Sequence, residues 1–214
     1  MRSGILSPAA CRWAAAVVCG VLCFALAVSR SSDPKSLGTL EEAKHASVRG
    51  ASAISGTSVY AGDAVKTDEQ GTVRLRLGKG KLYLSASSSA SLEQRAGLAT
   101  VTLAQGSATF SLPDPTQFEL ETPVGVLRAS GTKLTRGQVR ITKANEVEVS
   151  ASHGDLVLDS DGEYYTLPQG KTFRIMIVAD SNSQAGDRSK QKSQATQHPK
   201  RELHFFPVQP TNLT

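Results

Sequence analysis

Cysteine is almost missing from this sequence. There are only three, and all of them lie close to the N-terminus: Cys11, Cys19 and Cys23. The rest of the chain therefore has no disulfide framework, no thiolate nucleophile and no cysteine-ligated zinc site. Helical periodicity is also missing beyond the N-terminal segment, and aromatic residues make up 5% of the chain. The chain beyond the N-terminal segment must be held together by an apolar core of its own.

Clustered charge of one sign is missing as well. The chain has 24 Lys and Arg residues against 19 Asp and Glu residues, and two of the basic residues, Arg2 and Arg12, precede the N-terminal apolar segment. Nucleic-acid binders gather basic residues on one face, together with aromatic side chains that stack on bases. The basic residues here are scattered, so we expect no nucleic-acid partner.

The sequence also lacks a recognisable catalytic or metal-binding constellation. Its four histidines are not spaced as metal ligands: His45, His153, His198 and His204. Residues 159–162 (DSDG) contain part of a calcium loop but no closing Glu, and Asp-Gly between apolar strands predicts a hairpin turn. The serine-rich run 85–91 has no nucleophile elbow and no matching base. We therefore expect no enzyme, no metal and no cofactor.

One long apolar run is present, from Trp13 to Val28, within residues 1–29. With its flanks it approaches the roughly 20 residues that cross a bilayer, and Arg2 and Arg12 would place the N-terminus in the cytoplasm. A cleaved signal peptide is the second interpretation, because residues 25–27 (ALA) supply a small-residue cleavage site. We favour an anchor in the inner membrane. Both interpretations place the rest of the chain outside the cytoplasm.

The remaining sequence divides into a polar linker over 30–47, a domain over 48–180 and a polar tail over 181–214. Within the domain, apolar and polar residues alternate, as in Val73, Leu75 and Leu77. A period of two predicts strands with one buried face, and turn signals follow about every ten residues. We predict an all-β domain of short antiparallel or solenoid-like strands, preceded by one apolar helix. Alternation alone does not choose between a sandwich and a solenoid.

A weak internal repeat supports the β prediction. Its copies are centred on three glycines, Gly62, Gly106 and Gly154, each expected to turn the chain between two short strands. The tail is rich in Ser, Gln and Lys and is predicted to be disordered. Its apolar end, 203–208 (LHFFPV), has two interpretations. We favour docking on the domain as an edge strand over a short linear motif for a partner.

An ordered series of motifs runs through the domain. It comprises Gly56, Val59, Gly62-Asp63, Val65, Thr67, Gly71, Val73-Arg74-Leu75, Gly80, Leu82-Tyr83-Leu84, Leu103, Gly106, Phe118 to Pro123, and Gly131-Thr132. This series resembles the FecR family from about Val48 to Ile177. The resemblance implies a FecR-type all-β periplasmic module. Regulatory members of that family cross the inner membrane once, hold a cytoplasmic sigma-regulating region and read the state of an outer-membrane transducer such as an iron–siderophore receptor.

Two departures from that plan shape the expected function. Only about a dozen residues precede the apolar segment, too few for a helical anti-sigma domain, and the tail is too short for a further signalling domain. We therefore expect a non-catalytic binding or signalling module for an envelope protein. The alternative is a module that binds carbohydrate or peptidoglycan through four tyrosines: Tyr60, Tyr83, Tyr164 and Tyr165.

Eight motif residues are expected to shape the fold rather than to bind a ligand: Gly62, Asp63, Thr67, Gly106, Thr122, Pro123, Gly131 and Thr132. Asp63 is expected to accept hydrogen bonds from backbone amides of its turn. The Thr122-Pro123 step should hold an extended exit from a strand. Gly131 should occupy a position where a Cβ would clash.

Overall fold

Sixteen strands and no helix make up the part of the chain that the structure, a computed structural model, describes: residues 35–114, 117–131, 133–179 and 201–208. The predicted all-β class is confirmed. The predicted N-terminal helix and apolar segment, residues 1–29, lie outside the described residues. Among the described residues there is no helix long and apolar enough to cross a membrane.

The strands follow one another in the order β1 (Gly38–Val48), β2 (Ala51–Ser52), β3 (Ser58–Val59), β4 (Ala64–Leu77), β5 (Gly80–Leu84), β6 (Ser89–Arg95), β7 (Leu98–Gln105), β8 (Ser107–Leu112), β9 (Phe118–Thr122), β10 (Gly125–Ala129), β11 (Thr135–Lys143), β12 (Glu146–His153), β13 (Leu156–Ser160), β14 (Glu163–Leu167), β15 (Thr172–Ala179) and β16 (Arg201–Pro207). The described pairs are antiparallel except β7 with β9, which is parallel.

Strands extend beyond both predicted boundaries of the domain. β1 occupies much of the segment 30–47 that was expected to be a linker, and β16 lies inside the expected disordered tail 181–214. Each of these polar segments carries few apolar residues, but they meet the core: Leu40 is fully buried, and Leu203 and Phe205 pack against the core cluster. A neighbouring strand supplies the hydrogen-bond ladder, so few buried side chains are enough to hold each segment.

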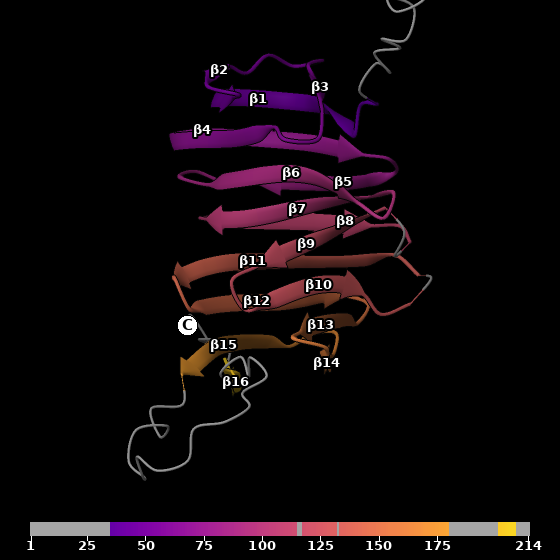
Figure 1. Cartoon of the computed structure of the whole chain (residues 1–214), viewed down its shortest axis with the longest axis vertical. Helices are drawn as coiled ribbons and strands as arrows, with labels where there is room; N and C mark the ends of the chain where they lie inside the picture. The colour runs from indigo at the N-terminus through magenta and orange to yellow at the C-terminus, as the bar shows by residue number, and fades with distance from the viewer. Residues whose placement is uncertain (1–34, 115–116, 132, 180–200, 209–214) are drawn as a thin grey trace, which may run out of the picture. The chain divides into compact units, whose positions relative to one another are not determined.

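All of the strands belong to one sheet, which divides at β4 (Figure 1). The first part of β4, 64–66, pairs with β6, and the last part, 73–77, pairs with β5. From there β6, β7, β9, β10, β13 and β14 continue as one half of the sheet, here called wing A. β5, β8, β11, β12, β15 and β16 continue as the other half, wing B. The fold is therefore one curled sheet rather than two separate ones.

The predicted alternation places one apolar core on the inner side of both wings. In β4, Val73, Leu75 and Leu77 are fully buried while Arg74 and Arg76 between them are exposed. Wing A adds Leu103, Leu120 and Leu158, and wing B adds Leu82, Val139 and Ile175 to the same cluster. Burying a side chain of this size stabilises the fold by about 2 kcal/mol. A charge placed at one of these positions would lose that contribution and require desolvation as well.

Connections between the wings differ at the two margins of the sheet. At the margin of the β4–β5 and β6–β7 hairpins, four connections pass from wing to wing: β8 to β9, β10 to β11, β12 to β13 and β14 to β15. At the opposite margin, β4 itself bends across, and the β5–β6 and β7–β8 connections follow it. Beyond β8, connections at this second margin only join neighbouring strands of one wing. We call this second side the open margin.

Candidate functional site

The Gly62-Asp63 motif fastens the turn that leads into β4. The Tyr60 backbone N–H donates to Asp63 Oδ2 at 2.9 Å, and Arg49 Nε lies 2.9 Å from Asp63 Oδ1. The Arg49 guanidinium also lies 5.5 Å from the centre of the Tyr60 ring. Asp63 is only 3% exposed, and Gly62 has a φ of +89°. The carboxylate therefore holds a turn together with an arginine and leaves no oxygen facing an open site.

Thr67 and Gly106 meet at the crossing between β5 and β6. The Thr67 hydroxyl donates to the Ser85 carbonyl at 2.6 Å and accepts from the Ser88 N–H at 2.8 Å. Gly106 has a φ of +84°, and a Cβ there would lie 2.5 Å from Ser88 Cα. A side chain at Gly106 would push this crossing away, so both motif residues position the backbone where the chain passes between the wings.

The remaining motif residues lie elsewhere. Thr122 donates its hydroxyl to the Gly125 carbonyl at 2.8 Å across the β9–β10 turn, where Pro123 follows it. The clash expected at Gly131 is wrong, because a Cβ built there meets nothing within 4 Å on this exposed loop. Thr132 lies outside the described residues. The motif residues are thus spread over several turns and are not brought together into one site.

The four tyrosines do not form a row either. Tyr60 precedes β4, Tyr83 lies on the outer face of wing B, Tyr164 lies on the outer face of wing A, and Tyr165 points inward. A sugar-binding platform needs aromatic rings along one face, so nothing in this arrangement favours the carbohydrate alternative. Among the described residues, no group of three His, Cys, Asp or Glu side chains could hold a metal ion.

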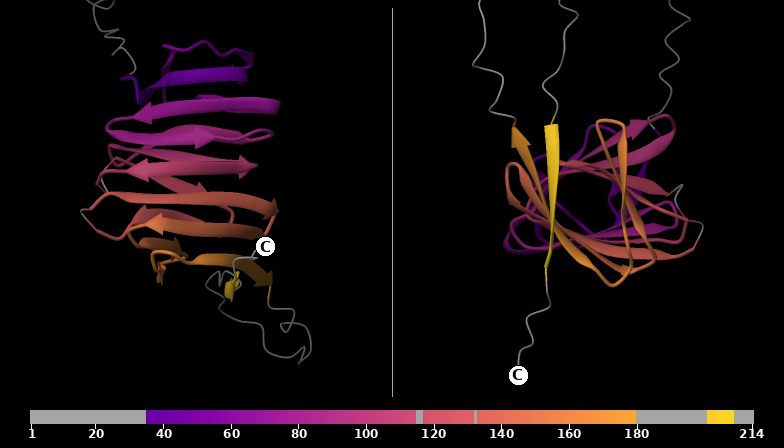
Figure 2. Two further views of the ribbon diagram at one scale, coloured as in Figure 1. Left: turned by 180° about the vertical axis from the view of Figure 1, so that it is seen from behind. Right: turned by 90° about the horizontal axis from the view of Figure 1, so that it is seen from below.

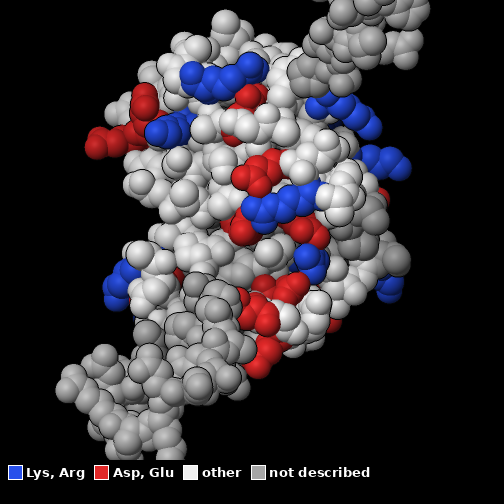
Figure 3. Space-filling model, in the orientation of Figure 1, with Lys and Arg blue, Asp and Glu red and all other residues white. Residues whose placement is uncertain are grey.

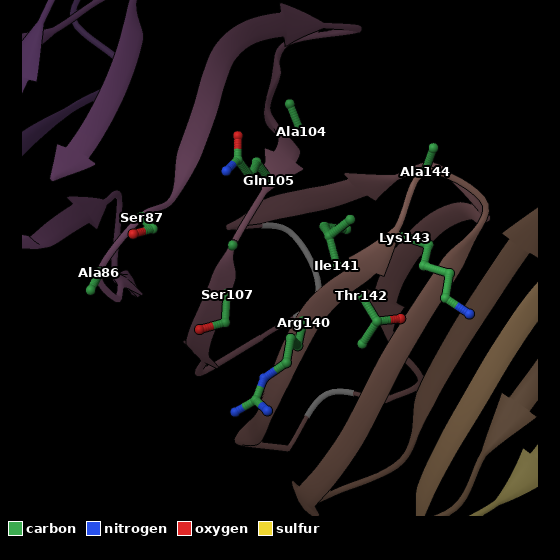
Figure 4. Close-up of a pocket in the computed structure, with 11 residues that line it drawn as sticks. Ala86, Ser87, Ala104, Gln105, Ser107, Arg140, Ile141, Thr142, Lys143 and Ala144 are labelled. Carbon is green, nitrogen blue, oxygen red and sulfur yellow. The ribbon is translucent and has the colours of Figure 1, made fainter. Parts of the chain in front are cut away.

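A groove of about 610 Å³ lies at the open margin, between the Gly106 turn and the end of β11 (Figure 4). Most of the side chains that line it are small, and its charged groups are Arg140 and Lys143. These two side chains point away from each other (Figure 4), and Lys143 Nζ pairs with Glu146 at 3.1 Å. Because no two cations converge, the groove does not provide a built anion site.

Ion pairs cross the outer face of wing A. Arg128 lies between Glu119 at 2.6 Å and Asp159 at 3.0 Å, and the hydrogen bond that Arg128 donates to Glu119 raises the pKa of Arg128. A second arginine, Arg95, joins Glu93 at 2.8 Å to Glu121 at 3.0 Å. Figure 3 shows basic and acidic side chains interspersed on the visible face in this way. Arg128 thus joins β10 to its neighbours β9 and β13, and Arg95 on β6 reaches across β7 to Glu121 on β9.

The N-terminal end of the sheet is covered by the chain itself. β2 and β3 both pair with β1, one at each end of that strand. Between them, the Gly56 N–H donates to the Leu40 carbonyl at 2.8 Å and the Leu40 N–H to the Thr57 carbonyl at 2.9 Å. The backbone groups along this edge of β1 are therefore largely satisfied.

The C-terminal end has no such cover in the part of the chain that the structure describes. β14 pairs only with β13, and β16 pairs only with β15. Figure 2 shows β16, in yellow, at the lower end of the stack of strands. Both wings therefore finish in a strand with one unpaired edge, and such an edge can pair with another chain.

Apolar side chains gather at this C-terminal end. Four large hydrophobic side chains are strongly exposed among the described residues: Ile54 at 70%, Tyr164 at 68%, Phe206 at 46% and Val178 at 42%. Three of the four belong to β14, β15 and β16. Between the wings, the rings of Tyr165 and Phe205 lie 4.8 Å apart. The last layer thus exposes apolar side chains on the outer faces of both wings and has an aromatic contact between them.

Two carboxylates act on the Tyr165 hydroxyl at the open margin of this layer, Glu163 through a hydrogen bond and Glu202 through its charge. Tyr165 donates its hydroxyl to Glu163 on β14, and this hydrogen bond is the main reason that its pKa is raised. The negative charge of Glu202 on β16 raises the pKa further. The C-terminal end therefore combines free strand edges, exposed apolar side chains and negative charge from both wings.

Sequence reasoning found one part of this surface and missed the rest. The apolar segment 203–208 was expected to dock as an edge strand, and that prediction is confirmed by its pairing with β15. The exposure of Tyr164 and the approach of Glu163 and Glu202 to one hydroxyl were missed. They depend on which strands end the two wings, and the residue pattern does not encode that order.

Comparison with known proteins gives little further guidance. No family model matches the chain, and no curated protein matches it. Among solved structures, the chain is similar to a putative anti-sigma factor from Parabacteroides distasonis ATCC 8503, with 13% sequence identity and a TM-score of 0.46. The match covers 67% of this chain and 59% of that chain, so it spans about three fifths of the length of the solved protein. A likeness at this level carries no argument about function.

Proposed function

We propose that this chain is a non-catalytic binding module of the cell envelope that engages another protein through the C-terminal end of its sheet. The observation that carries the proposal is the placement of Tyr164, Val178 and Phe206 on the last layer, next to two unpaired strand edges. An open sheet edge is a template to which an extended segment of another protein can add.

A FecR-like signalling role is the finer form of this proposal. It is supported by the ordered motif series from Gly56 to Thr132, several members of which hold turns and crossings of the sheet. In that role the module would sit on the periplasmic side of the inner membrane and respond to an envelope protein such as a transducer. The lack of a catalytic constellation in the sequence supports binding rather than chemistry.

The proposed tether is the apolar segment 13–28, with a cleaved periplasmic form as the alternative. Sequencing the N-terminus of the native protein and washing its membranes with salt tests this point. An intact N-terminus in salt-resistant membranes supports a single-pass anchor. A soluble chain that begins near residue 28 would contradict the anchor and leave a free periplasmic module.

Site-specific photocrosslinking in intact cells tests the binding surface. The photoreactive residue replaces Tyr164 or Phe206 at the C-terminal end, or Gln138 on the exposed outer face of wing B as the control. We expect a protein adduct of defined mass from the two C-terminal positions and none from the control. Equal adducts from all three positions would contradict a specific surface, and recovery of sugar polymer alone would favour the carbohydrate alternative.

A further inference from the structure

Resting on the proposed function, we infer that the partner adds an extended segment to the free edge of β16, pairing with Leu203 and Phe205. We infer further that this segment carries alternating apolar residues and a Lys or Arg that faces Glu202 and Glu163. The partner is thus identified by its chemistry, as an extended apolar segment with a basic residue at one end.

The backbone of β16 shows which groups are available. The Val208 N–H donates to the Thr172 carbonyl at 2.9 Å, so alternation along an antiparallel pair directs Phe206 and His204 toward β15 as well. The opposite edge of β15 shows the same alternation, because the Ile177 N–H points away from β16 and donates to the Asn145 carbonyl at 3.0 Å on the β12 side. The N–H groups of Leu203 and Phe205 therefore point to the free edge of β16.

Pro207 limits how far a pairing segment can extend. It lies in the same alternating set as Leu203 and Phe205, so its nitrogen also faces the free edge, but proline has no N–H to donate. The N–H groups of Leu203 and Phe205 remain with the accompanying carbonyls, together with that of Arg201 at the first residue of the strand. The edge therefore accommodates a short segment that ends near Pro207, rather than a long strand that could continue into an aggregate.

Side chains on the inner side of β16 define the apolar part of the partner. Leu203 and Phe205 are only partly buried although they pack on the core, and the ring of Phe205 contacts Tyr165 from the opposite wing. A segment added beside β16 would place every second side chain over these groups. Covering them with apolar side chains removes further apolar area from water, the main favourable term in such an association.

Negative charge at the open margin defines the basic part. Glu163 and Glu202 come from the two wings, and neither forms an ion pair with a side chain that the structure describes. Glu163 accepts the hydrogen bond of Tyr165, which leaves its second oxygen for a cation. A Lys or Arg at the matching end of the segment complements both carboxylates and fixes the direction in which it lies.

A second copy of this chain fits the edge less well. The antiparallel self-pairing that places Leu203 of one copy opposite Phe205 of the other, and so uses the free-edge N–H groups of both residues, is centred on His204. The same register puts the Glu202 carboxylate of one copy opposite the half-exposed Phe206 ring of the other. Cross-strand pairs stabilise a sheet when their chemistry matches, so this pairing favours a different partner.

The test uses the full chain in its native envelope, with the photoreactive residue at Phe206. Phe205→Pro removes the free-edge N–H together with the ring, and Phe205→Ala, the matched control, removes only the ring. We expect the yield of the partner adduct to be about fivefold lower with proline than with alanine, the factor that one hydrogen bond contributes. Glu202→Lys should lower the yield by a similar factor. The segment recovered in the adduct should be apolar at alternate residues and carry a Lys or Arg.

Exchange of the Met176 amide shows whether β16 stays docked, because Met176 pairs with His204. If Phe205→Pro undocks β16, hydrogen exchange of the Leu203 and Phe205 amides is measured in the unsubstituted chain instead. Crosslinking to the partner must slow the exchange of these two amides. Unchanged exchange overturns the inference. Equal adduct yields for Phe205→Pro and Phe205→Ala overturn strand addition but leave the proposed function in place. An adduct of two copies overturns the external partner. The absence of adducts from both Phe206 and Tyr164 overturns the proposed function itself.

Discussion

The two ends of the sheet differ in how their last strands are covered. A sheet that is not closed leaves unpaired backbone groups on its last strand. At the N-terminal end the chain covers that strand with β2 and β3 and pins the following turn with Asp63 and Arg49. At the C-terminal end, β14 and β16 each keep one edge unpaired among the described residues, beside exposed apolar side chains. This contrast in how the two ends are covered is the observation behind our proposal that the second end binds a partner.

The uncovered end nevertheless carries features that restrain aggregation. β14 is only five residues long, and β16 ends in Pro207. Glu163 and Glu202 add charge at the margin. Short strands, proline and charge are the usual means by which proteins protect an exposed edge. These features therefore limit non-specific strand pairing at the C-terminal end.

Matched truncations at the two ends should give the largest difference. Leu40→Ala removes a fully buried side chain under the N-terminal cover, and we expect it to lower the free energy of unfolding by about 3 kcal/mol. Leu203→Ala removes a partly buried side chain from β16, and we expect about 1 kcal/mol because less area is lost. Denaturation in urea measures both. Equal losses of unfolding free energy would contradict the inference that the N-terminal end is packed more tightly than the C-terminal end.

The pinned turn should give an intermediate effect. Asp63→Ala removes a buried carboxylate that accepts from the Tyr60 N–H and pairs with Arg49. We expect a loss of about 2 kcal/mol, because hydrogen bonds to charged groups are among the stronger ones. Asp63→Asn keeps an acceptor oxygen for Tyr60 and should cost less. Denaturation of the two variants gives this order, and an Asn variant as unstable as the Ala variant would contradict the role of the turn hydrogen bond.

The smallest effect concerns pH at the C-terminal end. The hydrogen bond to Glu163 favours the protonated phenol and raises the pKa of Tyr165. A raised pKa in the folded state means that the stabilisation is present below the unfolded pKa of about 10 and is lost as the pH rises through the folded pKa. Tyr165→Phe should therefore flatten the fall in stability above about pH 10, measured as unfolding free energy against pH. A slope unchanged by this substitution would show that Tyr165 is not the titrating group.

Much of the fold could be predicted from residue pattern. Alternation in β4 identified a strand because Val73, Leu75 and Leu77 repeat with a period of two. β1 was missed because only Leu40 and Val48 are buried along its length, and a bulge near His45, where φ is +43°, interrupts the pattern. Strand order was not predictable either, because the division of β4 between two neighbours depends on pairing rather than on local propensity.

The candidate surface could be predicted only in part, and for a related reason. The apolar run from Leu203 to Val208 stands out from a polar tail, which made its docking a reasonable prediction. Glu163 and Glu202 are far apart in the sequence and carry no motif. Their common influence on the pKa of Tyr165 exists only because β14 and β16 end the two wings.

The order of the strands along each wing follows their order along the chain, so the sheet can be laid down progressively as the polypeptide is delivered N-terminus first. Each newly emerged strand finds a template already in place, and the growing edge moves steadily away from β1. At every intermediate length the nascent sheet ends in an unsatisfied edge of the kind that the finished molecule retains. The surface that we propose for a partner is thus the last edge formed by strand addition. A partner strand bound there would extend the sheet in the same way as the chain's own strands did.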